Sequence, residues 1–194
     1  PELSNQGRGF YQLDFAGVSV ELVSEAIVIP GDVNAPVAAD IFLSRGAAYD
    51  NTVALYRVDD LSGGLDVDGD RVIDVSPGDE RYAQAALDRA RDPVTGLLLT
   101  TPDNFSTSQQ RADLLGSAMY GVVLIPNRSI DDVLRNNPDH QASQDSVAFF
   151  SFNKANPDGM AHASRRGELT YGFEDQLLGG DHDFNDINLK IVIT

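Results

Sequence analysis

The sequence predicts an all-β fold, a β-sandwich with long loops and a short helical insertion. Several short segments alternate apolar with polar residues or carry runs of β-branched residues, as strands do. Clusters of Gly, Pro, Asn and Asp separate these segments and predict turns. One stretch alone carries a strong helical pattern. Many short strands with one helix are typical of a sandwich.

The strands follow one another along most of the chain. We predict strands at residues 9–15, 18–23, 26–30, 51–58, 96–100, 120–126, 146–152 and 187–193. Residues 120–126 form an unbroken apolar run, which predicts a central strand. Residues 38–43 fit either a strand or a short turn. Residues 106–111 are polar throughout and predict a loop.

The helical insertion is predicted at residues 77–90, where Ala is the dominant residue. Asp79 is placed to cap its first turn, and Pro93 is placed to end it. A second, shorter helix is predicted through residue 134, with Ser129 as its N-cap.

Composition limits the classes of protein that the sequence fits. The 194 residues predict a single domain over residues 1–194, and its net charge of −16 argues against nucleic-acid binding. The absence of Cys excludes a disulfide framework and thiolate metal sites. No apolar run is long enough to span a membrane, so no membrane insertion is expected. The chain opens without a signal-peptide pattern, which indicates a module of a larger protein or a mature chain.

Residues 171–186 carry the strongest functional signal. Clustered carboxylates repel one another unless a cation lies among them, and oxygen-only ligands at irregular spacing favour Ca²⁺ over Mg²⁺. Two consecutive glycines let the backbone turn so that the acids converge. The predicted calcium ligands here are Glu174, Asp175, Asp181, Asp183, Asn185 and Asp186. His182 is expected to point away from them into solvent.

A second acidic stretch lies at residues 66–79. Acids at alternate positions resemble the spacing of a calcium loop, but the glycine stands at the fourth place and a proline at the twelfth, unlike an EF-hand. An ordinary Asp/Gly hairpin turn is the alternative. The predicted ligands are Asp66, Asp68, Asp70, Asp74 and Asp79. The sequence leaves open whether the two acidic stretches lie close together.

A third group occupies residues 156–162. Asn156 and Asp158 are candidate oxygen ligands for further calcium ions, so several Ca²⁺ ions are expected in all. His162 is a candidate contact to a ligand or to a carboxylate. The alternative is a β-turn followed by a surface histidine.

The motif Gly172-Phe173-Glu174-Asp175, followed by Gly-Gly-Asp-x-Asp-Phe-Asn-Asp at residues 179–186, resembles the signature of the DUF4114 family. The segment Asn-x-Asp-Gly…His at residues 156–162 and the Pro-Gly-Asp-x-x-Tyr-Ala pattern from residue 77 are also similar to that family, so the resemblance is expected to cover most of the chain. Such domains occur in large secreted bacterial proteins, including calcium-dependent RTX adhesins. The resemblance therefore implies an extracellular or cell-surface location.

Some RTX adhesins carry a module of similar size that captures the C-terminal end of a peptide. That likeness implies a calcium-dependent recognition module, monomeric within a larger chain, that binds a peptide C-terminus on a host or neighbouring cell. The arginines expected in loops or at helix ends, and so available to pair a terminal carboxylate, are Arg128, Arg135, Arg165 and Arg166.

Two other functions remain open from the sequence. Calcium could bind sugar hydroxyls directly, as in lectins, although the absence of Trp disfavours glycans. Calcium could also stiffen a stalk domain that binds nothing. We do not expect an enzyme, because no Gly-x-Ser-x-Gly, cysteine nucleophile or zinc motif is present.

Overall fold

The computed structural model describes residues 3–5, 10–15, 18–23, 25–46 and 48–194. The strands are β1 (Leu3–Asn5), β2 (Phe10–Phe15), β3 (Val18–Val23), β4 (Ile27–Val28), β5 (Pro36–Arg45), β6 (Thr52–Val58), β7 (Gly96–Leu99), β8 (Ser106–Leu115), β9 (Met119–Ile125), β10 (Phe149–Phe150), β11 (Ala163–Gly167), β12 (Thr170–Phe173) and β13 (Ile187–Ile193). The helices are α1 (Tyr82–Arg91) and α2 (Ile130–Asn136), with 3₁₀ turns η1 (Asn153–Ala155) and η2 (Leu177–Gly179). None of the described helices is long and apolar enough to cross a membrane.

The fold is an all-β sandwich, as predicted. One sheet has the strand order β10-β9-β6-β7 with β4 added beside β9, and the other has the order β11-β12-β13-β5-β8. All strand pairs in both sheets are antiparallel. Strands β1, β2 and β3 form a separate antiparallel sheet. The predicted first strand begins at Gly9, which lies outside the described residues.

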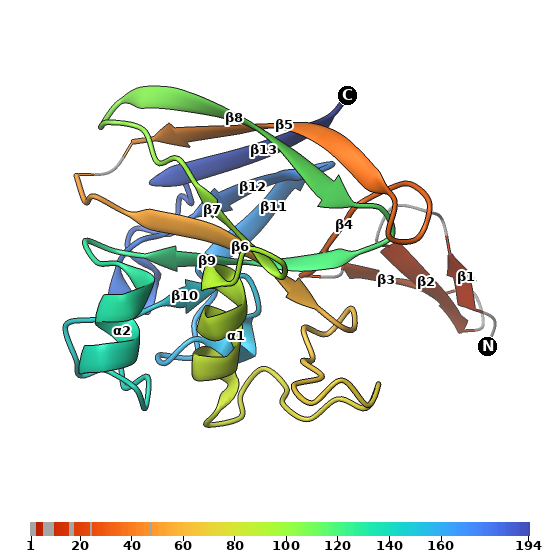
Figure 1. Cartoon of the computed structure of the whole chain (residues 1–194), viewed down its shortest axis with the longest axis horizontal. Coiled ribbons are helices and arrows are strands. Elements are labelled where there is room, and N and C mark those ends of the chain that lie inside the picture. The colour runs from red at the N-terminus through yellow and green to blue at the C-terminus, as the bar shows by residue number, and fades with distance from the viewer. Residues whose placement is uncertain (1–2, 6–9, 16–17, 24, 47) are drawn as a thin grey trace.

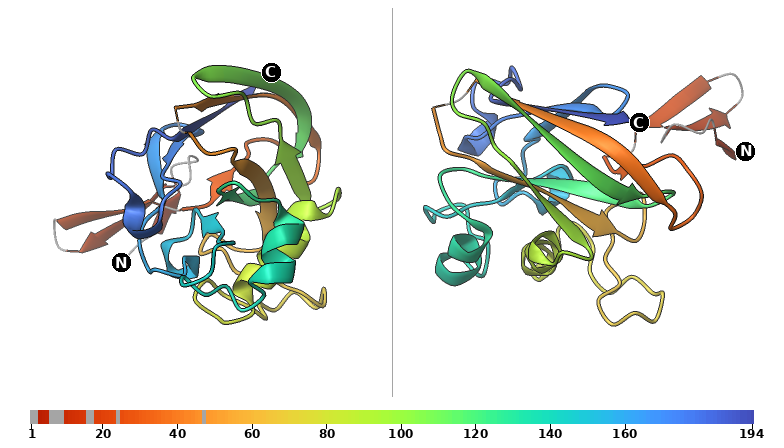
Figure 2. Two further views of the ribbon diagram at one scale, coloured as in Figure 1. Left: turned by 90° about the vertical axis from the view of Figure 1, so that its left-hand side faces the viewer. Right: turned by 45° about the horizontal axis from the view of Figure 1, so that its top comes forward.

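The two sheets face each other, and both helices cover the outer face of the sheet that contains β6 and β9 (Figures 1 and 2). Two hydrophobic cores result. Val53 and Leu55 of β6 pack between the sheets, whereas Ala54 and Tyr56 pack against the helical layer. Because both faces of this sheet are covered, β6 and β9 are apolar almost throughout, which confirms the prediction of a central strand at residues 120–126.

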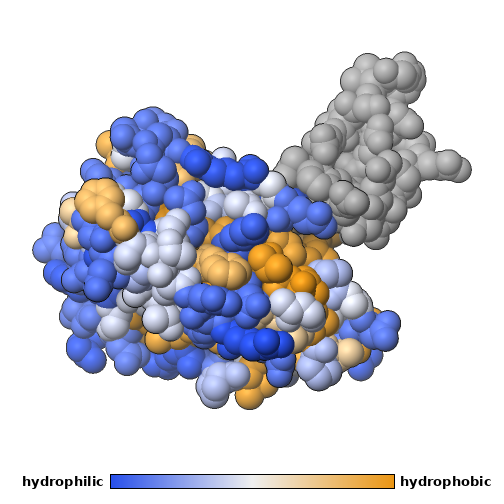
Figure 3. Space-filling model, turned by 90° about the horizontal axis from the view of Figure 1, so that it is seen from above, coloured by the Kyte–Doolittle hydropathy of each residue, from blue (hydrophilic) through white to orange (hydrophobic). Residues whose placement is uncertain are grey.

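The outer face of the β13–β5–β8 side is mostly hydrophilic, with a smaller hydrophobic area (Figure 3). Strand β8 lies at the edge of this sheet and pairs with β5 along its whole length. The prediction of a loop at residues 106–111 is therefore wrong. An edge strand with one solvated face needs few apolar residues, and of this strand only Leu114 is buried. The segment at residues 38–43 is a strand, part of β5.

The edge of β7 is closed by a side chain from β8. The Gln110 amide donates from Nε2 to the Leu98 carbonyl (3.3 Å) and accepts at Oε1 from the Thr100 N–H (2.9 Å). These are the two bonds that a neighbouring peptide group would make, so the side chain substitutes for a further strand. Gln110 thus occupies part of the free edge beside β7.

Both helices lie where the sequence predicted them, but the N-terminal cap of α1 differs from the prediction. Ser129 caps α2 through a capping box with Asp132, as predicted. Helix α1 begins at Tyr82, and its N-cap residue Arg81 makes no side-chain hydrogen bond. The prediction that Asp79 caps this helix is wrong, because its carboxylate accepts from the Ser76 N–H (2.7 Å) in the preceding turn.

Two further strand predictions need correction. Of the strand predicted at residues 146–152, only β10 (Phe149–Phe150) is paired, and residues 146–148 run without sheet hydrogen bonds. Strand β11 at residues 163–167 was not predicted, because its sequence is polar and has no alternation. It lies at the other edge of its sheet, where the same tolerance for polar residues applies.

Candidate metal sites in two acidic loops

Two acidic loops carry the candidate site residues, and they lie apart. We call residues 66–74 the first acidic loop and residues 174–186 the second acidic loop. The views in Figures 1 and 2 agree in placing them at different ends of the molecule. Each loop brings three carboxylates together: Asp66, Asp68 and Asp74 in the first, and Glu174, Asp181 and Asp183 in the second, with oxygen atoms of each triad within 4.8 Å of one another.

The first acidic loop is closed by an isolated bridge between Leu65 and Val75. Its carboxylates accept hydrogen bonds from the amides of the loop itself. Asp66 accepts from Gly69 N–H (2.7 Å) and Arg71 N–H (2.8 Å), and Asp74 accepts from Val67 N–H (2.8 Å). This arrangement fits both alternatives that the sequence left open, a calcium loop and an Asp/Gly hairpin turn. Desolvation acts to raise the pKa of Asp66, but the hydrogen bonds that its carboxylate accepts from backbone N–H groups outweigh it and lower the pKa.

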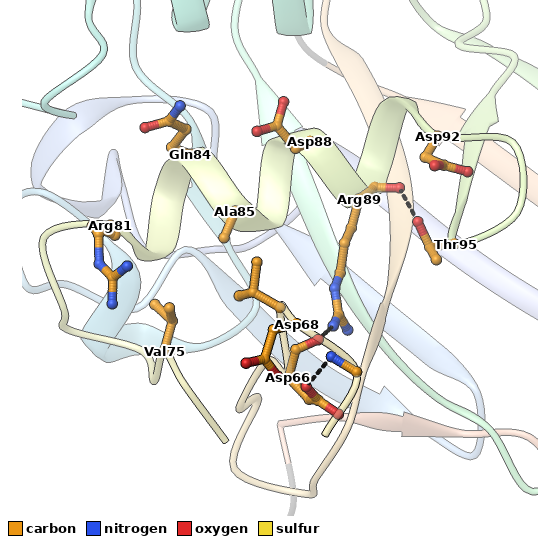
Figure 4. Close-up of a pocket in the computed structure, with 12 residues that line it drawn as sticks. Asp66, Asp68, Val75, Arg81, Gln84, Ala85, Asp88, Arg89, Asp92 and Thr95 are labelled. Carbon is orange, nitrogen blue, oxygen red and sulfur yellow. Dashed lines mark hydrogen bonds between the residues drawn. The ribbon is translucent and has the colours of Figure 1, made fainter. Parts of the chain in front are cut away.

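Helix α1 holds this loop from one side. Arg89 of α1 pairs with Asp59 (2.7 Å) and donates to the carbonyls of Arg57 (3.0 Å) and Asp66. Figure 4 shows the guanidinium group reaching from the helix to Asp66. A cavity of about 600 Å³ opens between the loop and the helix. The predicted ligands Asp70 and Asp79 are outside the triad. Asp70 accepts from Val72 N–H (2.8 Å), and Asp79 accepts from Ser76 N–H.

The second acidic loop connects β12 to β13 and is closed by the pairing of Phe173 with Ile187. Glu174 is buried, with 1 % of its surface exposed, and its carboxylate accepts from the Phe184 N–H. The other carboxylate oxygen of Glu174 lies so close to Gly180 that a Cβ atom added to this glycine would be 2.3 Å from the oxygen. The glycine pair therefore does what the sequence predicted, because it lets the backbone fold over the carboxylate.

Backbone strain is concentrated in the second acidic loop. Leu178, His182 and Phe184 all have positive φ, at 62°, 63° and 52°. Such residues cost energy and persist where the surroundings fix them, often at sites that hold a ligand. His182 is exposed, as predicted. The loop is also held by Arg166, whose guanidinium donates to the Asp183 carbonyl.

The acids closest to the core have altered pKa values. Burial raises the pKa of Asp175 to about 6, with the Asn51 hydrogen bond acting against the rise and the charge of Asp186 adding to it. Burial also raises the pKa of Glu174, against the Phe184 hydrogen bond and with the help of Asp186. Both shifts reflect negative charge that is poorly compensated within the protein.

Residues 156–162 hold the second acidic loop from the other side. The Asp158 side chain is 3 % exposed and accepts from Met160 N–H (3.0 Å), Leu178 N–H (2.7 Å) and His162 Nε2 (3.0 Å). Burial acts to raise its pKa, but these hydrogen bonds outweigh it and lower the pKa. Asp158 therefore anchors η2 to the loop at residues 156–160.

His162 and Asn156 are interior residues. His162 is fully buried, stacks on Phe149 with ring centroids 3.6 Å apart, and places Nδ1 3.2 Å from the Glu174 carbonyl. Of the two contacts predicted for it, the structure shows the one to a carboxylate. The Asn156 Oδ1 accepts from the Phe150 N–H (2.7 Å), and its Nδ2 donates to the Phe150 and Met160 carbonyls. Neither residue joins a carboxylate triad.

Three predicted ligands of the second acidic loop, Asp175, Asn185 and Asp186, lie outside its triad. Asn185 donates to the Asp183 carboxylate, and Asp186 accepts from Asp175 N–H (3.0 Å). Sequence reasoning missed Asn51, whose buried amide donates to Asp175 (2.8 Å) from a position 124 residues earlier in the chain. No local signal marks it, because only the pairing of β5 with β13 brings it there.

The arginines predicted to contact a ligand lie in different places. Arg128 is exposed, and its carbonyl accepts from the Thr52 hydroxyl (2.7 Å), next to Asn51 in sequence. Arg135 stands on α2, 3.8 Å from Asp132. Arg165 lies on β11 and donates to the Gly167 carbonyl (3.3 Å). The fourth predicted arginine, Arg166, donates directly to the Asp183 carbonyl of the second acidic loop, and Arg128 is linked to that loop through residues 50–52.

Comparison with family models gives one result for this chain. Residues 115–194 match the family described as "Domain of unknown function (DUF4114)". The match covers β9 to β13 and the whole second acidic loop, and it includes both C-terminal motifs that resemble the family. It is less than half of the chain, and the pattern from residue 77 lies outside it. Comparisons with curated proteins and with solved structures found no match.

The raised pKa of Asp175 predicts a pH effect in the absence of metal. Its pKa in the unfolded chain is near 3.9, so the protonated form stabilises the fold below about pH 4, and this contribution is lost as the pH rises through about 6. Asp175→Asn removes the titration. We expect its stability relative to the parent protein to increase by up to about 3 kcal/mol between pH 4 and pH 7, because one pKa unit corresponds to about 1.4 kcal/mol.

Urea denaturation of both proteins in chelator, at several pH values, measures this difference. The comparison cancels other titrating groups such as His140, whose pKa is lowered by burial and whose effect runs in the opposite direction. A stability difference that stays constant from pH 4 to pH 7 would contradict the assignment.

Proposed function

We propose that this chain is a calcium-dependent recognition module of a bacterial surface adhesin, and that it binds the C-terminal end of a peptide on a host or neighbouring cell. The observation that carries the calcium part is the convergence of Glu174, Asp181 and Asp183. Oxygen ligands in an irregular loop suit Ca²⁺, which accepts six to eight of them in flexible geometry. The extracellular location and the adhesin rest on the DUF4114 resemblance.

The ligand part is supported by the exposure of the triad. Asp181 and Asp183 are exposed while Glu174 is buried, so an ion held between them would keep part of its coordination open to solvent. A carboxylate is a strong ligand for such an ion. Arg166 is exposed, lies beside the triad residue Asp183 and is a candidate for a second contact to the same carboxylate.

The strained loop supports recognition over a purely structural role. Leu178 has positive φ and leaves 68 % of its surface exposed, although its N–H is bound by Asp158. A stalk domain gains nothing from an apolar side chain held in solvent at the cost of strain. A ligand with an apolar group beside its carboxylate would cover it.

Calcium should stabilise the protein and magnesium should not. At a Ca²⁺ concentration of about 100 times Kd, binding to the native state adds about 2.7 kcal/mol. For a domain of this size we expect the Tm to rise by roughly 5 to 11 °C. Asp181→Asn and Asp183→Asn should each reduce this rise, because each removes a charged ligand. Differential scanning calorimetry in chelator, in Ca²⁺ and in Mg²⁺ measures the effect.

The exposed Asp145 belongs to neither acidic loop, so Asp145→Asn is the matched control and should keep the full calcium response. Equal Tm values in chelator and in Ca²⁺, with no calcium in the protein by elemental analysis, would refute the metal site.

Ligand binding should require both calcium and a free carboxyl terminus. We expect an array of peptides with free C-termini to capture the protein in Ca²⁺ and to lose it in chelator. The same peptides with amidated C-termini should bind at least about tenfold more weakly, because the charged group that meets the ion is gone. Binding to a glycan array alone would indicate a lectin. Failure to bind any array in calcium would indicate a structural domain.

A further inference from the structure

Asn51 has a buried polar atom without a partner. It lies in the connection between β5 and β6 and is 4 % exposed. Its Nδ2 donates to Asp175 Oδ2 (2.8 Å), but its Oδ1 accepts no hydrogen bond. A buried carbonyl left in this state costs about 1–3 kcal/mol, and native proteins rarely leave one unpaired. The position of this oxygen therefore indicates a missing partner.

The surroundings of Asn51 define what that partner is. Asp175 is 2 % exposed, its N–H donates to Asp186 Oδ2 (3.0 Å), and the two carboxyl groups are within hydrogen-bonding reach of each other. Because Oδ1 and Nδ2 of Asn51 share one carbon, the unpaired oxygen lies beside the Asp175 carboxylate. The buried Asp175, the half-buried Asp186 and a buried amide oxygen attract a cation.

The carboxylate of Asp175 has different hydrogen-bond partners from that of Glu174 in the triad. Glu174 and Asp175 are consecutive residues in the connection between β12 and η2. The Glu174 carboxylate meets Phe184, and the Asp175 carboxylate meets Asn51. In the second acidic loop Asp181 and Asp183 are exposed, Asp186 is half-buried, and Glu174 and Asp175 are buried.

We propose that Asn51 Oδ1 and the carboxylates of Asp175 and Asp186 form an inner calcium site, separate from the triad of the same loop. The proposal rests on the calcium-dependent function proposed above. An ion there would give the Asn51 carbonyl its partner and would neutralise the neighbouring acids Asp175 and Asp186. All donors are hard oxygens from three separate segments, an irregular set that suits Ca²⁺ better than the regular octahedron of Mg²⁺.

The inner site would have a different task from the outer triad. It joins the β5–β6 connection, the end of β12 and the start of β13, where the Gly46 N–H already donates to the Asp186 carbonyl (2.9 Å). An ion at this junction fixes the base of the second acidic loop to the sandwich. The outer triad, with two exposed acids, remains the place where a ligand reaches an ion.

Calcium titration calorimetry on the parent protein, Asn51→Ala and Asn137→Ala tests the proposal. We expect Asn51→Ala to lose one calcium ion per chain, or to weaken one site by at least tenfold. Asn137 is the control, because it is a buried asparagine whose amide is fully hydrogen bonded to Gln141 and Ser146. Its replacement should lower stability and leave the number of bound ions unchanged.

Asn51→Asp separates a metal ligand from a simple hydrogen-bond donor. This variant keeps an oxygen for the ion, loses the donor to Asp175 and adds a buried charge. A ligand role predicts a lower Tm in chelator and a calcium-induced rise in Tm larger than that of the parent. A donor role predicts that Asn51→Ala and Asn51→Asp each lower the Tm equally with and without calcium, and that the number of ions is unchanged. That result would overturn the inner site.

The outcomes also distinguish this inference from the proposed function. If the parent protein binds calcium and both Asn51 variants bind it with the same number and affinity, only the inner site is refuted. If the parent protein binds no calcium at all, the proposed function fails together with the inner site.

Discussion

Repulsion among carboxylates at the junction of β12 and β13 is the constraint on which this end of the molecule depends. The pairing of Phe173 with Ile187 forces both ends of the second acidic loop together, and Asp175 is brought against Asp186. The backbone cannot relieve this contact without breaking the sheet. The N–H groups of Phe184 and Asp175 compensate part of the charge. Burial, reinforced by the charge of Asp186, raises the pKa values of Glu174 and Asp175.

The negative charge of the two acidic loops is stabilised in different ways. In the first, Asp66, Asp68 and Asp74 are all at least partly exposed, and short-range hydrogen bonds to the loop's own amides accommodate them. Water can solvate such a loop without an ion. In the second, Glu174 and Asp175 are buried, and the buried side chain of Asp158 contacts the loop from a separate segment of the chain. Burial makes the second acidic loop more dependent than the first on a compensating charge or hydrogen bond, because charge removed from water needs a specific partner.

The sequence predicted the fold class, the central strand at residues 120–126 and the Ser129 cap, because each depends on local patterns. It also identified the acids that form both triads. The sequence-based prediction failed for features that depend on the position of a segment in the folded protein. Strand β8 is polar because it lies at an edge, and a strand is recognised by its apolar face. The prediction of a cap at Asp79 was wrong, because its carboxylate accepts from the Ser76 N–H in the preceding turn.

Asn51 could not be found by any pattern in its neighbourhood, since a contact across 124 residues follows only from the assembled sheet. The same holds for Asp158, which the sequence marked as an acid in a turn. Its role as an anchor for Leu178 and His162 depends on the packing of β11 and β12 against the loop.

Hydrogen–deuterium exchange of the second acidic loop, in chelator and in calcium, tests the central claim most directly. We predict that the Leu178 and Phe184 amides exchange rapidly in chelator and are strongly protected in calcium, because neutralised acids let the loop close. Amides of the central strand β9 should be protected equally in both conditions. Equal protection of the loop amides with and without calcium would contradict the claim that an ion orders this loop.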